Sequence, residues 1–227
     1  MKLYCNTASI GEKQSGKTYH AIETLQENKN TLRIFINTKL EQKYYRNFRF
    51  IVNSIEEFVH YVFRDVNEKG LNNHYIYCFN PPPREKGNKT FIKFVDGVYD
   101  MIVNGTIPYP TILCVDEVRN YKGDALKSIN NIALKGEGFG LLLYSVSQRV
   151  QHFPTDIREN TDCWFMSQTK DTQLEFLSQN GIIQFPDSMR RKNRDGVLYE
   201  HKFDLWDSFK DRKIYVQEPM QPLKVLQ

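Results

Sequence analysis

Residues 11 to 18 read GEKQSGKT, which fits the pattern G-x-x-x-x-G-K-[S/T] of the phosphate-binding loop without a substitution. In such a loop, backbone N–H groups turn inward around the phosphates of a nucleotide. The Lys17 ammonium then reaches the β- and γ-phosphates, and the Thr18 hydroxyl is a ligand of Mg²⁺. Glycine is required where a Cβ would block the turn or the ligand. The candidate nucleotide-binding residues are Gly11, Glu12, Lys13, Gln14, Ser15, Gly16, Lys17, Thr18 and Tyr19.

A chance match to this pattern is the alternative, and the flanking sequence argues against it. Upstream, KLYCNTASI (2–10) is apolar and β-rich enough to be a strand. Downstream, TYHAIETLQEN (18–28) places Tyr19, Ile22 and Leu25 at helical spacing. The motif requires a strand, a loop and then a helix N-terminus, because the helix dipole attracts anions.

Length and composition bound the class of protein. The 227 residues, of which 40% are hydrophobic and 26% charged, predict a single α/β domain. We expect a core over about residues 1–180 and a C-terminal edge extension over 181–227. The net charge of +4 permits an acidic partner such as nucleic acid without requiring one. No apolar run approaches the ~20 residues of a membrane span, and no apolar secretion segment precedes the polar loop, so we expect a cytoplasmic protein.

The four cysteines lie far apart, mostly within apolar, strand-like stretches: Cys5, Cys78, Cys114 and Cys163. Without a C-x-x-C pair or a His-rich neighbour, the sequence does not suggest zinc. We expect buried, reduced thiols.

Strand-like and helix-like segments alternate along the chain. Strands are expected at 32–37, 48–53, 74–79, 111–118, 139–148 and 163–168, and helices at 54–66, 91–105, 124–138 and 171–179. Ser54 and Glu57 form a capping box at the start of one helix. The alternation predicts a largely parallel sheet with helices on both faces. Segments 196–204 and 211–217 are predicted to form an antiparallel pair at an edge.

Two carboxylates end a buried strand in ILCVDE (112–117), where ligands bind in open α/β sheets. We expect Asp116 to hold Mg²⁺ through its water shell and Glu117 to act as the general base on the attacking water. The alternative is a strand that merely ends in exposed charge.

The strand LLLYSVSQR (141–149) ends in a second polar group, Ser147 and Gln148. A glutamine in this place can hydrogen-bond both the γ-phosphate and the attacking water, and so report whether the nucleotide is intact. A simple polar strand cap is the alternative.

The series GEKQSGKT, ILCVDE, GFGLLLYSVSQR and PTDIREN resembles the FtsK–HerA superfamily of DNA-translocating ATPases. The short, single-domain form is most similar to the genome-packaging ATPases of icosahedral viruses with an internal membrane. The resemblance covers roughly residues 1–170, and the C-terminal tail carries no matching motif. It implies a RecA-like P-loop fold, ATP and Mg²⁺ as cofactors, and a ring, usually a hexamer, around double-stranded DNA. It also implies work in the host cytoplasm or at the packaging vertex of the virion, against a capsid or membrane-associated portal protein.

A ring ATPase of this kind uses a cation from a neighbouring subunit at the γ-phosphate, which is worth about 10³ to 10⁵ in rate in related hydrolases. Three arginines lie near predicted strand ends: Arg119, Arg149 and Arg158. The resemblance ranks Arg158 first, since PTDIREN falls where the superfamily has its trans-acting segment. Arg149 adjoins the predicted sensor and is open to a role in cis or in trans. A surface ion pair is the alternative for each.

A motor that does not read sequence grips phosphates through basic loops. The candidate pore residues are Lys39, Lys43, Arg46 and Arg49, then Arg84, Lys86 and Lys89, then Lys122 and Lys127, and the run MRRKNR (189–194). Each cluster taken alone is also compatible with solvated surface.

Other functions share part of this pattern. Zot-like phage assembly ATPases have the nucleotide motifs but usually a transmembrane segment as well. A HerA-type cellular translocase is expected to have an N-terminal β-barrel before a loop that here begins at residue 11. A nucleotide-dependent switch or adaptor has no need of a strong base such as Glu117, and a small-molecule kinase does not account for Gln148.

Overall fold

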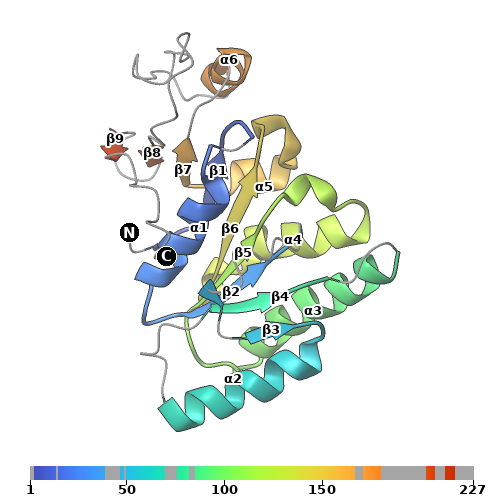
Figure 1. Cartoon of the computed structure of the whole chain (residues 1–227). Coiled ribbons are helices and arrows are strands. Elements are labelled where there is room, and N and C mark those ends of the chain that lie inside the picture. Colours follow the sequence, from blue (N-terminus) through green and yellow to red (C-terminus); the bar gives the residue numbers. More distant parts are fainter. Residues whose placement is uncertain are drawn as a thin grey trace, which may run out of the picture.

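The strands of the chain form one nine-stranded sheet in the order β3-β4-β2-β5-β6-β1-β7-β8-β9 (Figure 1). The computed structural model describes residues 3–13, 15–38, 47–48, 50–69, 76–81, 85–166, 171–179, 203–207 and 213–217. The strands are β1 (Thr7–Ile10), β2 (Leu32–Ile36), β3 (Phe50–Val52), β4 (Ile76–Phe79), β5 (Thr111–Val115), β6 (Leu141–Ser147), β7 (Cys163–Met166), β8 (Phe203–Asp207) and β9 (Lys213–Gln217). From β3 to β7 in this order all neighbours are parallel, and β8 and β9 are antiparallel additions at one edge.

The helices are α1 (Lys17–Glu27), α2 (Ile55–Lys69), α3 (Glu85–Val103), α4 (Asp124–Lys135), α5 (Thr155–Glu159) and α6 (Asp171–Gln179). Figure 1 shows α2, α3 and α4 following one another along the sheet, in agreement with the contacts of α3 with both neighbours. These three helices and α5 pack on one face, and α1 packs on the other.

Two apolar clusters, one on each face, explain why the central strands β2, β5 and β6 are mostly apolar. In β2, Ile34 and Ile36 lie in the cluster under α2 to α5, whereas Phe35 lies in the cluster under α1. In β5, Leu113 and Cys114 divide in the same way. Strands buried on both faces read as continuous apolar runs, which is the pattern of the sequence. The predicted α/β fold with a mostly parallel sheet is therefore confirmed.

Several element boundaries differ from the sequence-based expectation. Helix α3 begins at Glu85 instead of residue 91, because its first turns expose Asn88 and Lys89 and so carry no apolar signal. The predicted helix 124–138 ends at Lys135 and is followed by a separate 3-10 turn, Glu137–Phe139. Strand β8 begins at Phe203, near the end of the predicted segment 196–204.

The capping box at α2 also departs from its usual form. The Glu57 N–H donates to the Ser54 Oγ at 3.2 Å, as expected. The Glu57 carboxylate, however, accepts from the N–H of Asn53 at 2.8 Å, one residue earlier than the usual partner.

All four cysteines are free, and Cys78, Cys114 and Cys163 are buried. Burial raises the pKa of the Cys78 and Cys114 thiols, which keeps them protonated and unreactive at neutral pH. Within the described part of the chain, no helix is both long and apolar enough to cross a membrane.

The strand order determines where the site lies. Because β5, β6 and β1 are adjacent and parallel, the segments that follow them all leave the sheet at the same side, where the carboxyl ends of these strands lie. These segments are the phosphate-loop motif after β1, Asp116 and Glu117 after β5, and Gln148 after β6. Strand β2 lies on the other side of β5 and brings Thr38 to these carboxyl ends as well.

Candidate nucleotide-binding site

The phosphate-loop motif connects β1 to α1 as a tight turn. The Ser15 N–H donates to the Glu12 carbonyl at 3.2 Å, and Gly16 stands before the first turn of α1 with φ 84°. A residue with a Cβ would be strained at that φ, which is the physical reason for this glycine. The first turn of α1 contains no acidic side chain, so no negative side chain there opposes the attraction of the helix dipole for an anion.

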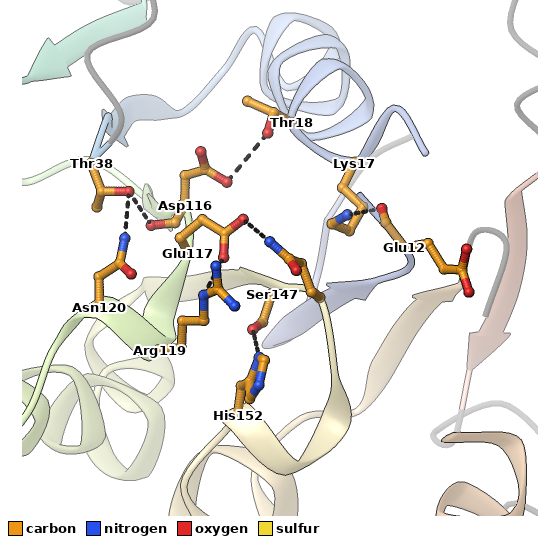
Figure 2. Close-up of polar contacts among 11 residues, drawn as sticks. Glu12, Lys17, Thr18, Thr38, Asp116, Glu117, Arg119, Asn120, Ser147 and His152 are labelled. Atoms are coloured by element: carbon orange, nitrogen blue, oxygen red, sulfur yellow. Dashed lines mark hydrogen bonds and ion pairs between the residues drawn. The ribbon is translucent and has the colours of Figure 1, made fainter. Parts of the chain in front are cut away.

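Lys17 is buried and its side chain folds back over the loop (Figure 2). Its Nζ donates to the Glu12 carbonyl at 2.5 Å and to the Ser15 Oγ at 3.3 Å. The ammonium therefore lies within the curve of the loop, beside the backbone groups that are predicted to surround the phosphates.

The two predicted magnesium ligands are in direct contact, although 98 residues separate them in sequence. The Thr18 Oγ1 donates to the Asp116 Oδ1 at 3.3 Å. Asp116 is buried, so its carboxylate is fixed by the fold. A hydroxyl and a carboxylate are oxygen donors of the kind that Mg²⁺ prefers, and their placement beside the loop fits a nucleotide-bound Mg²⁺.

Thr38, after the neighbouring strand β2, supports Asp116, and Asn120 of the turn after β5 contacts Thr38 in turn. The Thr38 Oγ1 donates to the Asp116 carbonyl at 3.1 Å, and the Asn120 Nδ2 donates to the Thr38 Oγ1 at 3.4 Å (Figure 2). Neither residue was predicted from the sequence. A single threonine after a strand has no motif, and only the pairing of β2 with β5 shows that it faces Asp116.

Glu117 has an unusual backbone conformation. It is buried, and its φ of 53° and ψ of 59° make it the one non-glycine residue with positive φ in the described part of the chain. Such a conformation costs of order 1 kcal/mol or more and is common at functional sites. It starts the 3-10 turn Val118–Asn120 and sends the Glu117 side chain in a different direction from that of Asp116 (Figure 2).

Both carboxylate oxygens of Glu117 have partners. The Gln148 Nε2 donates to Oε1 at 3.0 Å, which brings the two predicted catalytic residues into contact. The Arg119 Nε lies 3.2 Å from Oε2 and forms an ion pair, but among the described residues Oε2 accepts no hydrogen bond. Arg119 is therefore engaged with the glutamate of its own chain.

His152 is a further member of this group that the sequence did not reveal. Its Nδ1 lies 3.2 Å from the Ser147 Oγ (Figure 2). Burial lowers the pKa of His152, the charges of Arg119 and Arg149 lower it further, and Glu117 opposes them. The imidazole is therefore neutral at pH 7. It belongs to a short 3-10 turn, Val150–His152, which gives no distinctive sequence signal.

The other predicted residues are more dispersed. Arg149 is exposed. Arg158 lies on α5, where its guanidinium donates to the Thr155 Oγ1 at 3.1 Å and stands over the Phe176 ring at 5.3 Å. Tyr19 is half-buried on α1, Lys13 is exposed, and Gln14 lies outside the described residues.

The predicted pore residues are only partly described. Lys39, Lys43, Arg46, Arg49, Arg84 and the run 189–194 lie outside the described residues, and Lys86 is described only as a position in α3. Lys89 and Lys122 are exposed. Lys127 forms an ion pair with Asp124 at 2.8 Å.

No family model matches the sequence, and no curated protein is similar to it by sequence. Among solved structures, the chain is similar to the genome packaging NTPase B204 from Sulfolobus turreted icosahedral virus 2, in a complex with sulfate. The TM-score is 0.68 at 19% identity, over 95% of this chain and 97% of that one. The complex of the same NTPase with AMPPCP matches with a TM-score of 0.65 at 19% identity, over 96% and 98% of the two chains. The structure of EssC (ATPases 2 and 3) from Geobacillus thermodenitrificans matches with a TM-score of 0.56 at 14% identity, over 95% of this chain and 39% of that chain.

These similarities confirm the expected resemblance at the level of the fold. The matched NTPase is covered almost from end to end, so the likeness extends beyond the phosphate loop that many families share. The chain has the fold of the P-loop ATPases that include a viral genome-packaging NTPase and the ATPase domains of EssC.

Proposed function

We propose that the chain is an ATP-hydrolysing motor that translocates double-stranded DNA and packages a viral genome into a preformed capsid. The proposal of ATP hydrolysis rests on one observation. Lys17, Thr18, Asp116 and Glu117 lie together at the carboxyl ends of the parallel strands. The step from hydrolysis to DNA packaging is supported by the similarity in fold to a genome packaging NTPase.

In this proposal the loop N–H groups and the α1 N-terminus bind the phosphates of ATP. The Lys17 ammonium contacts the Glu12 carbonyl in the structure. When ATP binds, it contacts the β- and γ-phosphates instead. Thr18 and Asp116 hold Mg²⁺, which neutralises charge on the same phosphates when bound. Thr38 keeps Asp116 in place through its backbone carbonyl.

Glu117 then accepts the proton of the attacking water as general base. Gln148, which contacts Glu117 here, orients that water and senses the γ-phosphate. Arg158, or in its place Arg149, acts from the neighbouring subunit of a hexameric ring on the charge that develops at the γ-phosphate. The basic loops grip DNA, and a capsid vertex or portal protein anchors the ring.

A nucleotide-dependent switch is the second candidate, because one observation favours it. Gln148 donates to one oxygen of Glu117 and Arg119 forms an ion pair with the other, an arrangement that suits a protein that binds ATP and hydrolyses it slowly.

The test compares phosphate release by the purified protein with and without linear double-stranded DNA, together with displacement of a triplex-forming strand from that DNA. The motor is expected to hydrolyse ATP faster with DNA and to displace the strand with ATP but not with AMPPCP. Hydrolysis without strand displacement would favour the switch. Electron microscopy with DNA and AMPPCP then tests for a ring around the duplex.

A further inference from the structure

Arg119 reaches Glu117 because of the local backbone at the end of β5. The positive φ of Glu117 turns the chain into the 3-10 turn Val118–Asn120, which carries Arg119 two residues later. The Asn120 N–H donates to the Glu117 carbonyl at 2.9 Å and closes this turn. The Arg119 Nε therefore lies 3.2 Å from the Glu117 Oε2. Figure 2 marks this ion pair with a dashed line.

This contact affects the chemistry proposed for Glu117. A general base must direct an oxygen lone pair at the proton that it takes from water. Here the Gln148 amide donates a hydrogen bond to Oε1, and the Arg119 guanidinium forms an ion pair with Oε2 that lacks hydrogen-bond geometry. An oxygen held by a guanidinium is also a weaker proton acceptor, since the cation stabilises the charged carboxylate. The observed arrangement is therefore a resting state of the site.

The two partners of the ion pair differ in their access to solvent. The Glu117 side chain is 2% exposed, whereas the Arg119 side chain is 43% exposed. The same loop continues through the exposed Asn120 and Lys122. A phosphate outside the protein can therefore approach Arg119 without entering the site, and guanidinium groups bind phosphate and carboxylate with the same geometry.

We propose that Arg119 is a positioning residue that restrains Glu117. A DNA backbone phosphate removes the restraint by binding the Arg119 guanidinium in place of the Glu117 carboxylate. This regulation rests on the proposed function, because it requires ATP hydrolysis and DNA binding by the same chain. It makes ATP turnover depend on DNA within a single subunit, through one side chain of the loop that follows β5.

The test measures kcat and KM for ATP in the Arg119→Gln variant, with and without double-stranded DNA. Without DNA, kcat is expected to rise about five-fold, which corresponds to about 1 kcal/mol, the upper range for an exposed ion pair. The KM is expected to stay unchanged, and stimulation by DNA is expected to fall toward one-fold. Lys135→Gln is the matched control, since it removes an exposed cation at the end of α4 that belongs to neither the nucleotide site nor the candidate pore residues, and it is expected to leave the DNA-free kcat unchanged.

An unchanged or lower DNA-free kcat in Arg119→Gln overturns the restraint. A higher DNA-free kcat with full DNA stimulation overturns the role of the DNA phosphate. Arg119→Lys provides a second variant that keeps the cation without the fork, and its DNA-free kcat is expected between those of the wild type and Arg119→Gln. If the wild type itself hydrolyses no ATP with or without DNA, the proposed function fails instead, and this result is distinct from all the others.

Discussion

At the scale of the residue, Asp116 and Glu117 follow one another in sequence but take up different environments. Asp116 continues the direction of β5 and contacts Thr18, whereas Glu117 turns away with positive φ and contacts Gln148. The backbone strain at Glu117 is thus what separates the proposed magnesium ligand from the proposed general base in adjacent positions. This division of labour gives two predictions at this scale.

The first prediction concerns the lysine of the phosphate loop. Lys17→Ala is expected to abolish ATP hydrolysis and to weaken nucleotide binding, because it removes the cation from the β- and γ-phosphates. Lys13→Ala is the matched control, since Lys13 is exposed in the same loop and the proposal assigns a role to its backbone N–H but none to its side chain. Binding of a fluorescent ATP analogue and phosphate release measure the two effects. Near-normal turnover in Lys17→Ala contradicts the assignment of the loop.

The second prediction concerns the base. Glu117→Gln is expected to bind ATP normally and to lower kcat at least ~100-fold, the low end for the loss of a positioned general base. The substitution keeps the shape and an oxygen for Gln148 but removes the proton acceptor. Single-turnover hydrolysis after a binding measurement separates the two steps. A variant that binds ATP poorly yet hydrolyses bound ATP at the normal rate shows a structural role for Glu117.

At the scale of the element, the sequence predicted the strands well because burial on both faces leaves a continuous apolar run. The start of α3 could not be read in this way, since its first turns face solvent. The phosphate loop, Asp116, Glu117 and Gln148 were placed at strand ends by their motifs, and the fold brings them together. Thr38, His152 and the pairing of Arg119 with Glu117 depend on the order β2-β5-β6 and on the turn at Glu117, which no local pattern contains.

The connection from α4 to β6 provides a prediction of its own. A Cβ on Gly136 would lie 2.6 Å from the Leu141 carbonyl oxygen and 2.7 Å from that of Ile132, so the backbone would have to shift. Gly136→Ala is therefore expected to lower the free energy of unfolding by about 1–3 kcal/mol, the range for overpacking. Gly138→Ala is the control two residues away, where a Cβ meets nothing within 4 Å. Urea denaturation measures both, and equal stabilities contradict the close packing of this turn.

At the scale of the whole molecule, one described chain supplies only part of the positive charge that the proposed site needs at the γ-phosphate. Lys17 lies in the loop and Arg119 is engaged with Glu117 in the same chain, whereas Arg158 is held at α5 by Thr155 and Phe176. Arg119 is thus suited to a role in cis, and Arg158 and Arg149 remain the candidates for a role across a subunit interface. The assembly itself is part of the proposal, and it can be tested without a structure of the ring.

The last prediction uses two inactive proteins, Glu117→Gln and Arg158→Ala. If Arg158 of one subunit completes the site of the next, some interfaces of a mixed ring contain an intact Glu117 on one side and an intact Arg158 on the other. In a randomly mixed ring at equal concentrations, roughly a quarter of the interfaces are of this kind. Phosphate release in the presence of DNA is therefore expected to reappear on mixing, since the transition-state charge is stabilised across the interface.

The control mixes Glu117→Gln with a chain that carries both substitutions, because no interface then has an intact Glu117 and no activity is expected. The same experiment with Arg149→Ala distinguishes the two arginines. Arg119→Ala is expected to hydrolyse ATP without a partner variant, since Arg119 restrains the glutamate of its own chain. If Arg158→Ala alone hydrolyses ATP normally with DNA, Arg158 is not the trans-acting residue. If no arginine variant complements and the protein stays monomeric with ATP and DNA, the ring motor is wrong. The hydrogen bond of Glu117 with Gln148 and its ion pair with Arg119 then favour the switch, because they suit a chain that binds ATP and hydrolyses it slowly.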